Sequence, residues 1–198
     1  MSFAWAFYSI PRTAVSAYFS GPCPEKIGAI HAALKWDEGA LDDEAAEFVA
    51  RHIASRGLNY SGLDEDQAAL LDEALGMLTS PEGLAEALEL KPESPDFVHP
   101  SVIDSLLRNA GAAQMPTLLL PILRSGRRFG AAGPTSDCNY CVLTPSEAGQ
   151  LASELSAVLS ATKSWGKEKW MPDLVTECLI GPLIQAEKAD RHLLGLLG

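Results

Sequence analysis

The chain has 198 residues, of which 47% are apolar and 21% are charged, a composition typical of a globular domain and not of a disordered or fibrous protein. Its formal net charge of −11 argues against nucleic acid or an anionic membrane as the main partner. No apolar run is long enough to span a membrane, and the N-terminus lacks the basic and apolar regions of a signal peptide. The four cysteines are therefore expected to be reduced thiols in the cytoplasm.

The N-terminal residues alternate in character. Phe3, Trp5 and Phe7 fall on one face and Tyr8 falls on the other. Alternation of this kind predicts a strand over residues 3–10 that is buried on at least one side.

Helical spacing dominates the next part of the chain. Apolar residues recur every three to four positions and are bounded by glycine, proline or acidic capping residues. His31 and His52 both lie on apolar faces, where a hydrogen-bonded core histidine is the usual role. The pattern predicts helices over residues 12–20, 27–34, 41–56, 64–78 and 81–90.

The negative charge is concentrated in residues 37–96. This segment holds 16 acidic and 3 basic residues, a net charge of −13, while the rest of the chain is close to neutral. Charge runs of this kind usually form solvated helix faces that keep a protein in solution. The alternative is a surface that attracts a basic partner, because a concentrated negative field speeds encounter with a positive protein.

The chain from residue 91 to residue 137 gives weaker signals. Residues 91–100 contain three prolines and predict an exposed connector. A short helix is expected after Pro100, and a buried helix kinked at Pro121 is expected over residues 115–123. The Gly- and Ala-rich residues 129–137 predict a loop.

A strand followed by a helix is the best-specified unit of the sequence. Residues 139–143 suit a short strand, and Thr144, Pro145 and Glu147 form the start signal of a helix over residues 145–161. Threonine at the N-cap with glutamate three residues later is the spacing of a capping box. The apolar positions of the helix share one stripe, which predicts its core face.

The last residues complete a small sheet. A connector over residues 165–170 leads to a long helix that Gly181 and Pro182 should bend. The apolar residues 192–197 suit a strand that lies inside the sheet. We therefore predict a single α+β domain over residues 1–198, in which about eight helices pack against a mainly antiparallel sheet of strands 3–10, 139–143 and 192–197.

Catalytic and metal-binding motifs are missing from the sequence. Cys138 and Cys141 lack the second ligand pair of a zinc site, and on a strand residues three apart point to opposite faces. No phosphate-binding loop, dinucleotide-binding loop, zinc-protease motif or nucleophile elbow is present. No cofactor or metal is expected, and an enzyme is less expected than a binding protein.

The residues from Tyr140 to Ala148, followed by an apolar helix, resemble the YfbM-like family of small bacterial proteins. Leu143, Thr144, Pro145 and Glu147 match the family's strand that enters a capped helix. The outline of residues 173–197 is also similar, with a long helix before a C-terminal strand. The resemblance implies an α+β fold and no assigned activity, and some members of the family look like partners of bacterial toxins.

Two functions follow as hypotheses. The first is a protein-binding module, such as an immunity-type or inhibitor protein, whose acidic surface meets a basic protein. The alternative is an enzyme or a small-molecule-binding protein with a pocket between the sheet and the connector 165–170. The oligomeric state stays open. The candidate partner-binding residues are Glu47, Asp72, Glu73, Glu86 and Glu89, and the candidate pocket residues are Trp5, His31, His52, Trp165 and Trp170.

Overall fold

We describe the fold from a computed structural model, which places residues 5–11, 24–34, 41–57, 59–78, 98–110, 140–162 and 164–197. These residues form both helices and strands, so the expected α+β class is confirmed. The elements in chain order are β1 (Trp5–Ile10), the 3₁₀ turn η1 (Pro24–Lys26), α2 (Ile27–Ala33), α3 (Asp43–Arg56), α4 (Glu65–Leu78), α6 (Pro100–Ala110), β2 (Tyr140–Leu143), α8 (Pro145–Ala161), α9 (Met171–Val175), the π-helical turn η2 (Thr176–Ile180), α10 (Gly181–Lys188) and β3 (His192–Leu197).

The sheet has three antiparallel strands in the order β1–β3–β2. The C-terminal strand β3 is central, with β1 on one side and β2 on the other. Gly195 of β3 pairs with Phe7 of β1 and with Cys141 of β2, so these three residues form one row across the sheet. The expected antiparallel sheet is confirmed, and the N-terminal strand reaches β2 only through β3.

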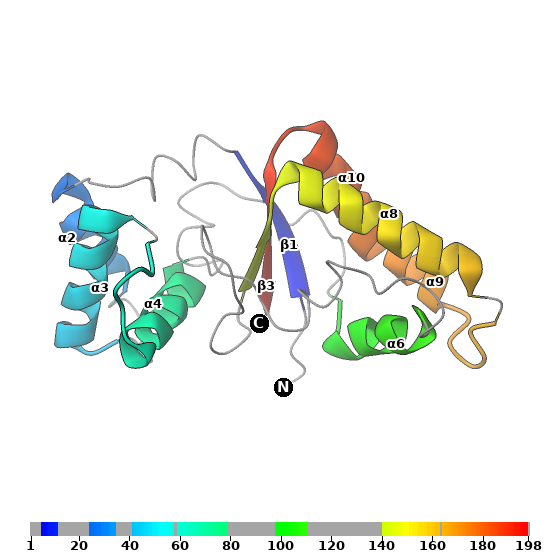
Figure 1. Ribbon diagram of the computed structural model, residues 1–198, viewed down its shortest axis with the longest axis horizontal. Helices are drawn as coiled ribbons and strands as arrows, with labels where there is room; N and C mark the ends of the chain where they lie inside the picture. The colour runs from blue at the N-terminus through cyan, green and yellow to red at the C-terminus, as the bar shows by residue number, and fades with distance from the viewer. Residues whose placement is uncertain are drawn as a thin grey trace.

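Both faces of the sheet are buried. In β1, Trp5 and Phe7 enter a cluster with α6, α8, α9 and α10, whereas Tyr8 and Ile10 enter a cluster with α2, α3 and α4. Figure 1 shows the two groups of helices on opposite sides of the strands. The described part of the chain therefore forms three layers, with the sheet in the middle.

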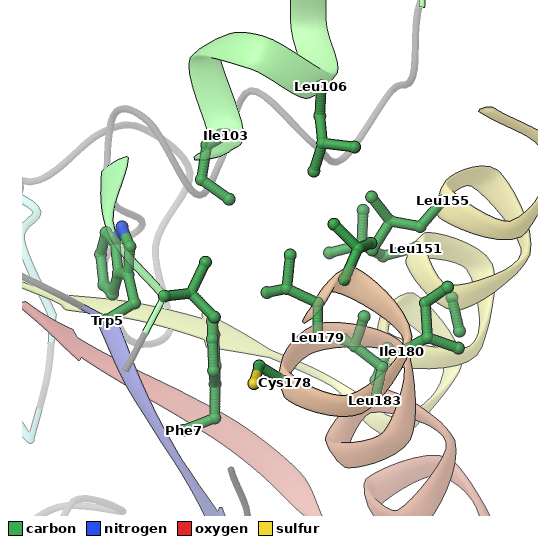
Figure 2. Close-up of a cluster of buried hydrophobic side chains, with 14 of the residues drawn as sticks. Trp5, Phe7, Ile103, Leu106, Leu151, Leu155, Cys178, Leu179, Ile180 and Leu183 are labelled. Atoms are coloured by element: carbon green, nitrogen blue, oxygen red, sulfur yellow. The ribbon is translucent and has the colours of Figure 1, made fainter. Parts of the chain in front are cut away.

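The cluster on the α8 side is the larger of the two clusters in the described residues and contains Trp5 and Phe7. The rings of Trp5 and Phe7 stack with their centroids 6.4 Å apart and their planes at 18°. The backbone N–H of Trp5 donates to the carbonyl of Val98 over 2.8 Å, which joins the edge of β1 to the chain just before α6. Figure 2 shows that these rings point toward side chains of α6, α8, η2 and α10, namely Ile103, Leu106, Leu151, Leu155, Cys178, Leu179, Ile180 and Leu183.

Helix α8 begins at the expected capping box. The backbone N–H of Glu147 donates to Thr144 Oγ1 over 3.3 Å, and the backbone N–H of Thr144 donates to Glu147 Oε2 over 2.9 Å. Pro145 occupies the first turn, where a missing N–H costs nothing. The predicted apolar stripe is buried, and its central members are Leu151 and Leu155.

The last helix contains a π-helical turn. Pro182 has no N–H to donate, so a regular α-helical ladder cannot continue through it. Just before it, η2 adopts the wider spacing, and the N–H of Gly181 donates to the carbonyl of Thr176. The sequence predicts a bend at Gly181 and Pro182, and the structure shows a change in hydrogen-bond spacing beside them.

Helix α10 ends in a Schellman motif that turns the chain into β3. Asp190 has a φ of 53°, and its N–H donates to the carbonyl of Glu187 over 3.1 Å. The N–H of Arg191 donates to the carbonyl of Ala186 over 3.0 Å. Both bonds satisfy carbonyls at the helix end, as this motif requires.

The described residues contain six helices when α9, η2 and α10 are counted as one continuous helix. This is fewer than the expected eight or so. The helices predicted over residues 12–20, 81–90 and 115–123 lie outside the described residues, as does the loop over 129–137. Among the helices that are described, none combines the length and apolar character needed to cross a membrane.

Candidate functional site

Helices α3 and α4 form one layer and expose many carboxylates. The bases between residues 41 and 78 are Arg51 and Arg56, both exposed. The described part of the acidic segment is therefore a negatively charged surface over the face of the sheet that Tyr8 and Ile10 occupy. Its exposed acidic residues are Asp42, Asp43, Glu44, Glu47, Asp64, Glu65, Asp66 and Glu73.

Some of these carboxylates cap helices. Asp42 Oδ1 accepts the N–H of Ala45 over 2.8 Å at the start of α3. Asp64 Oδ1 accepts the N–H of Gln67 over 2.8 Å at the start of α4. Acids in the first turn also interact favourably with the helix dipole. Asp42 and Asp64 therefore act as N-caps, and both remain exposed.

The expected partner-binding residues separate into three groups. Glu47 and Glu73 are exposed beyond the first turns of their helices. Glu47 forms an ion pair with Arg51 one turn along, and an exposed pair of this kind contributes about 0.5 kcal/mol or less. Glu86 and Glu89 lie outside the described residues. Asp72 was expected at the surface, and this is wrong.

Asp72 is buried, with 1% of its surface exposed. The hydroxyl of Tyr60 donates to Asp72 Oδ1 over 2.6 Å, and the hydroxyl of Tyr140 donates to the same oxygen over 3.2 Å. The two hydroxyl oxygens lie 3.2 Å apart. We call Tyr60, Asp72 and Tyr140 the Tyr–Asp cluster. It joins the loop before α4, α4 itself and strand β2.

Burial and hydrogen bonding explain why a carboxylate is tolerated in this position. A buried charge is costly unless donors compensate it, and two phenols supply such donors. Burial, followed by the charge interaction with Tyr140 and the hydrogen bond to Asp72, raises the pKa of Tyr60 well above its usual value. The phenol therefore stays protonated and remains a donor. The cluster links α4 to the sheet.

The sequence carries a signal for this burial. Asp72 lies four residues after Ala68 and three before Leu75, at the edge of the apolar stripe of α4. An acidic residue at such a position is either at the boundary of the core or inside it with donors. The distant Tyr140, which decides between the two, lies 68 residues away.

The expected pocket does not form as one site. Trp5 is buried and Trp165 is partly buried in the cluster on the α8 side of the sheet. His31 and His52 belong to α2 and α3 on the other side. Trp170 is 52% exposed. The sheet separates the histidines from the tryptophans, so the proposed grouping is wrong.

His52 has a structural contact in place of a catalytic one. Its Nε2 lies 2.8 Å from the carbonyl oxygen of Asn59, and its ring stacks on Phe48 with centroids 6.0 Å apart. His52 is also buried. It therefore holds the chain after α3 against the helix, as the usual role of a histidine on an apolar face predicts.

The described thiols lie in the core. Cys141 and Cys178 are both buried and are not joined in a disulfide. Cys138 lies outside the described residues, so the predicted divergence of the two sulfurs stays a prediction. Within the ranges that the structure places, no group of three histidine, cysteine or acidic residues is arranged to hold a metal ion.

The layer of α3 and α4 is thus the candidate functional surface, with the Tyr–Asp cluster beneath it. Comparisons of this chain with protein-family models, with curated proteins and with solved structures give no match.

Proposed function

We propose that this chain is a protein-binding module that meets a basic protein through the exposed carboxylates of α3 and α4. The observation that carries the proposal is the presence of these carboxylates on two helices of one layer, with Arg51 and Arg56 as the bases beside them. In the described parts of α3 and α4, Glu47 and Glu73 are the exposed acidic side chains beyond the helix starts. We propose further that the module acts in the cytoplasm as an immunity-type or inhibitor protein, with a basic toxin or nuclease as its partner. We also propose that the chain is a member of the YfbM-like family.

Electrostatic attraction determines how such a module works. Residues 41–78, which include α3 and α4, hold nine acidic and two basic residues, a net charge of −7, so the field around this layer attracts a positive surface and accelerates encounter. The Debye length is about 8 Å at physiological ionic strength, so added salt screens the attraction. Association should therefore slow as the salt concentration rises, while dissociation changes less.

Charge reversal on the layer of α3 and α4, which we call the acidic layer, tests the proposal. We would compare the wild type, the variant Glu47→Lys/Glu73→Lys and a control variant, Glu177→Lys/Glu187→Lys. The control makes the same change in net charge on exposed residues of the opposite layer. Each protein is used as bait in a native cytoplasmic extract, and bound proteins are identified by mass spectrometry at low and at high salt.

We expect the wild type and the control to capture a basic protein at low salt. The Glu47→Lys/Glu73→Lys variant should not capture it. Melting curves of the three proteins should agree within a few degrees, because surface substitutions change stability by about 0.5 kcal/mol. If the recovered proteins are indifferent both to the reversal and to salt, the acidic layer serves only to keep the protein in solution.

A further inference from the structure

The two layers of helices differ in the share of small side chains that they bury against the sheet in the described residues. The α8 side uses the large apolar cluster of Figure 2. On the other side, α3 and α4 place six described side chains in the core, and three of them are alanines (Ala46, Ala50 and Ala74) beside Val49, Ile53 and Leu71. On the α8 side, alanines are three of the fifteen helical side chains in the cluster. Hydrophobic stabilisation grows with the apolar area that is buried, so an alanine contributes less than a leucine or a phenylalanine. These alanines leave α3 and α4 more dependent on their other links to the sheet.

The acidic layer also carries an electrostatic cost. The exposed carboxylates of α3 and α4 repel one another, because two arginines do not balance them. Self-repulsion of one charge sign weakens a compact state. Opening of this layer would relieve some of the repulsion. The opposite layer carries a smaller excess, with eight acidic and four basic residues over the described ranges 98–110, 145–162 and 164–190.

The Tyr–Asp cluster lies where this layer meets the sheet. Tyr140 belongs to β2 and is fully buried, so it stays with the sheet. Asp72 belongs to α4, and the bond from the Tyr140 hydroxyl to Asp72 therefore crosses between sheet and helix. Tyr60 is only partly buried and adds its bond from the loop between α3 and α4.

We propose that the Tyr–Asp cluster is a latch that holds α3 and α4 on the sheet. With the Tyr140 hydroxyl donating to the Asp72 carboxylate, the layer stays closed. Without this bond, α3 and α4 open as a unit while α8, α10 and the sheet remain folded. Local opening of contiguous units at a lower free energy than global unfolding is a general property of proteins. The inference concerns the isolated chain and does not depend on the proposed partner.

Amide hydrogen exchange of the full chain, followed by mass spectrometry, tests the latch. The variant Tyr140→Phe removes the crossing hydroxyl and keeps the ring in the core. The control is Tyr8→Phe, which removes the phenolic hydroxyl of another buried tyrosine in the cluster on the same side of the sheet, but on β1. Asp72→Asn is a second variant that keeps the shape of the side chain and removes its charge.

If the cluster is a latch, the amide exchange rate of peptides from α3 and α4 should rise about tenfold or more in Tyr140→Phe. The reason is that this variant loses a buried hydrogen bond to a charged acceptor. Asp72→Asn should accelerate the same peptides. Peptides from α8 and α10 should exchange at the wild-type rate in both variants. The proposal is overturned if all helices accelerate together, if α3 and α4 do not change, or if Tyr8→Phe gives the same pattern as Tyr140→Phe.

Discussion

The Sγ of Cys141 lies 2.7 Å from the point that a β-carbon on Gly195 would occupy. Gly195 is in the central strand β3, and Cys141 is its partner on β2. The ring of Phe7, its partner on β1, comes within 3.0 Å of the same point, and the ring of Trp5 within 3.1 Å. The missing side chain at Gly195 lets neighbours from both edge strands close over the middle of the sheet.

The substitution Gly195→Ala should therefore destabilise the protein. The added methyl group meets a sulfur and two aromatic rings that are buried and tightly packed, so the side chains must shift together. Overpacking of this kind costs about 1–3 kcal/mol. Urea denaturation of the variant should show a lower midpoint with an unchanged slope. A midpoint equal to that of the wild type would show that the row adjusts without cost.

The substitution Gly149→Ala provides the matched comparison and should have the opposite sign. A β-carbon there would come within 2.1 Å of the Glu187 carboxylate, but that carboxylate is the end of a flexible, exposed side chain and can move away. Alanine is favoured over glycine inside a helix by about 0.8–1 kcal/mol. The melting temperature should stay the same or rise. A clear fall would mean that Glu187 is held in place.

Tyr60 should make stability depend on pH in the alkaline range. Its pKa is raised in the folded protein above the usual value of 10.0, so folding favours the neutral phenol. The contribution is complete below pH 10 and is lost as the pH rises, because the unfolded chain ionises while the folded phenol does not. The loss due to this group approaches about 1.4 kcal/mol per pH unit.

The variant Tyr60→Phe isolates this effect. Urea denaturation at intervals from pH 8 to pH 11 should give a steeper decline in the free energy of unfolding for the wild type than for the variant. A smaller decline remains in the variant, because burial also raises the pKa of Tyr8. Parallel declines in the two proteins would show that Tyr60 ionises equally in both states.

Deletion of residues 192–198 should abolish the cooperative melting transition. Strand β3 pairs with both β1 and β2, so its loss removes every strand pairing of the three-stranded sheet. The deletion also removes Leu193 from the apolar cluster on the α8 side and Leu194 from the cluster on the opposite face of the sheet. Circular dichroism during heating measures the transition. A truncated protein that melts at the wild-type temperature would show that the sheet does not depend on this strand.

Local features of this protein follow from the sequence alone. The capping box of α8 was predictable because Thr144, Pro145 and Glu147 act within a few residues of one another. The C-terminal strand was predictable because an apolar run is costly to leave in water. The strands predicted near residues 3–10, 139–143 and 192–197 also agree with the structure, because alternating or continuous apolar runs mark them in the sequence.

Only the tertiary structure decided which distant residues meet. Spacing along the chain cannot show that β3 lies between β1 and β2, because strand order depends on long-range pairing. The same limit explains why the burial of Asp72 was not predicted. Its charge favours exposure, and the Tyr140 hydroxyl that compensates the charge lies 68 residues away in the sequence. It also explains the pocket that failed, because the sheet places His52 and Trp165 in different layers. Periodicity marks the face that a residue is on, and the packing of whole layers determines what that face contacts.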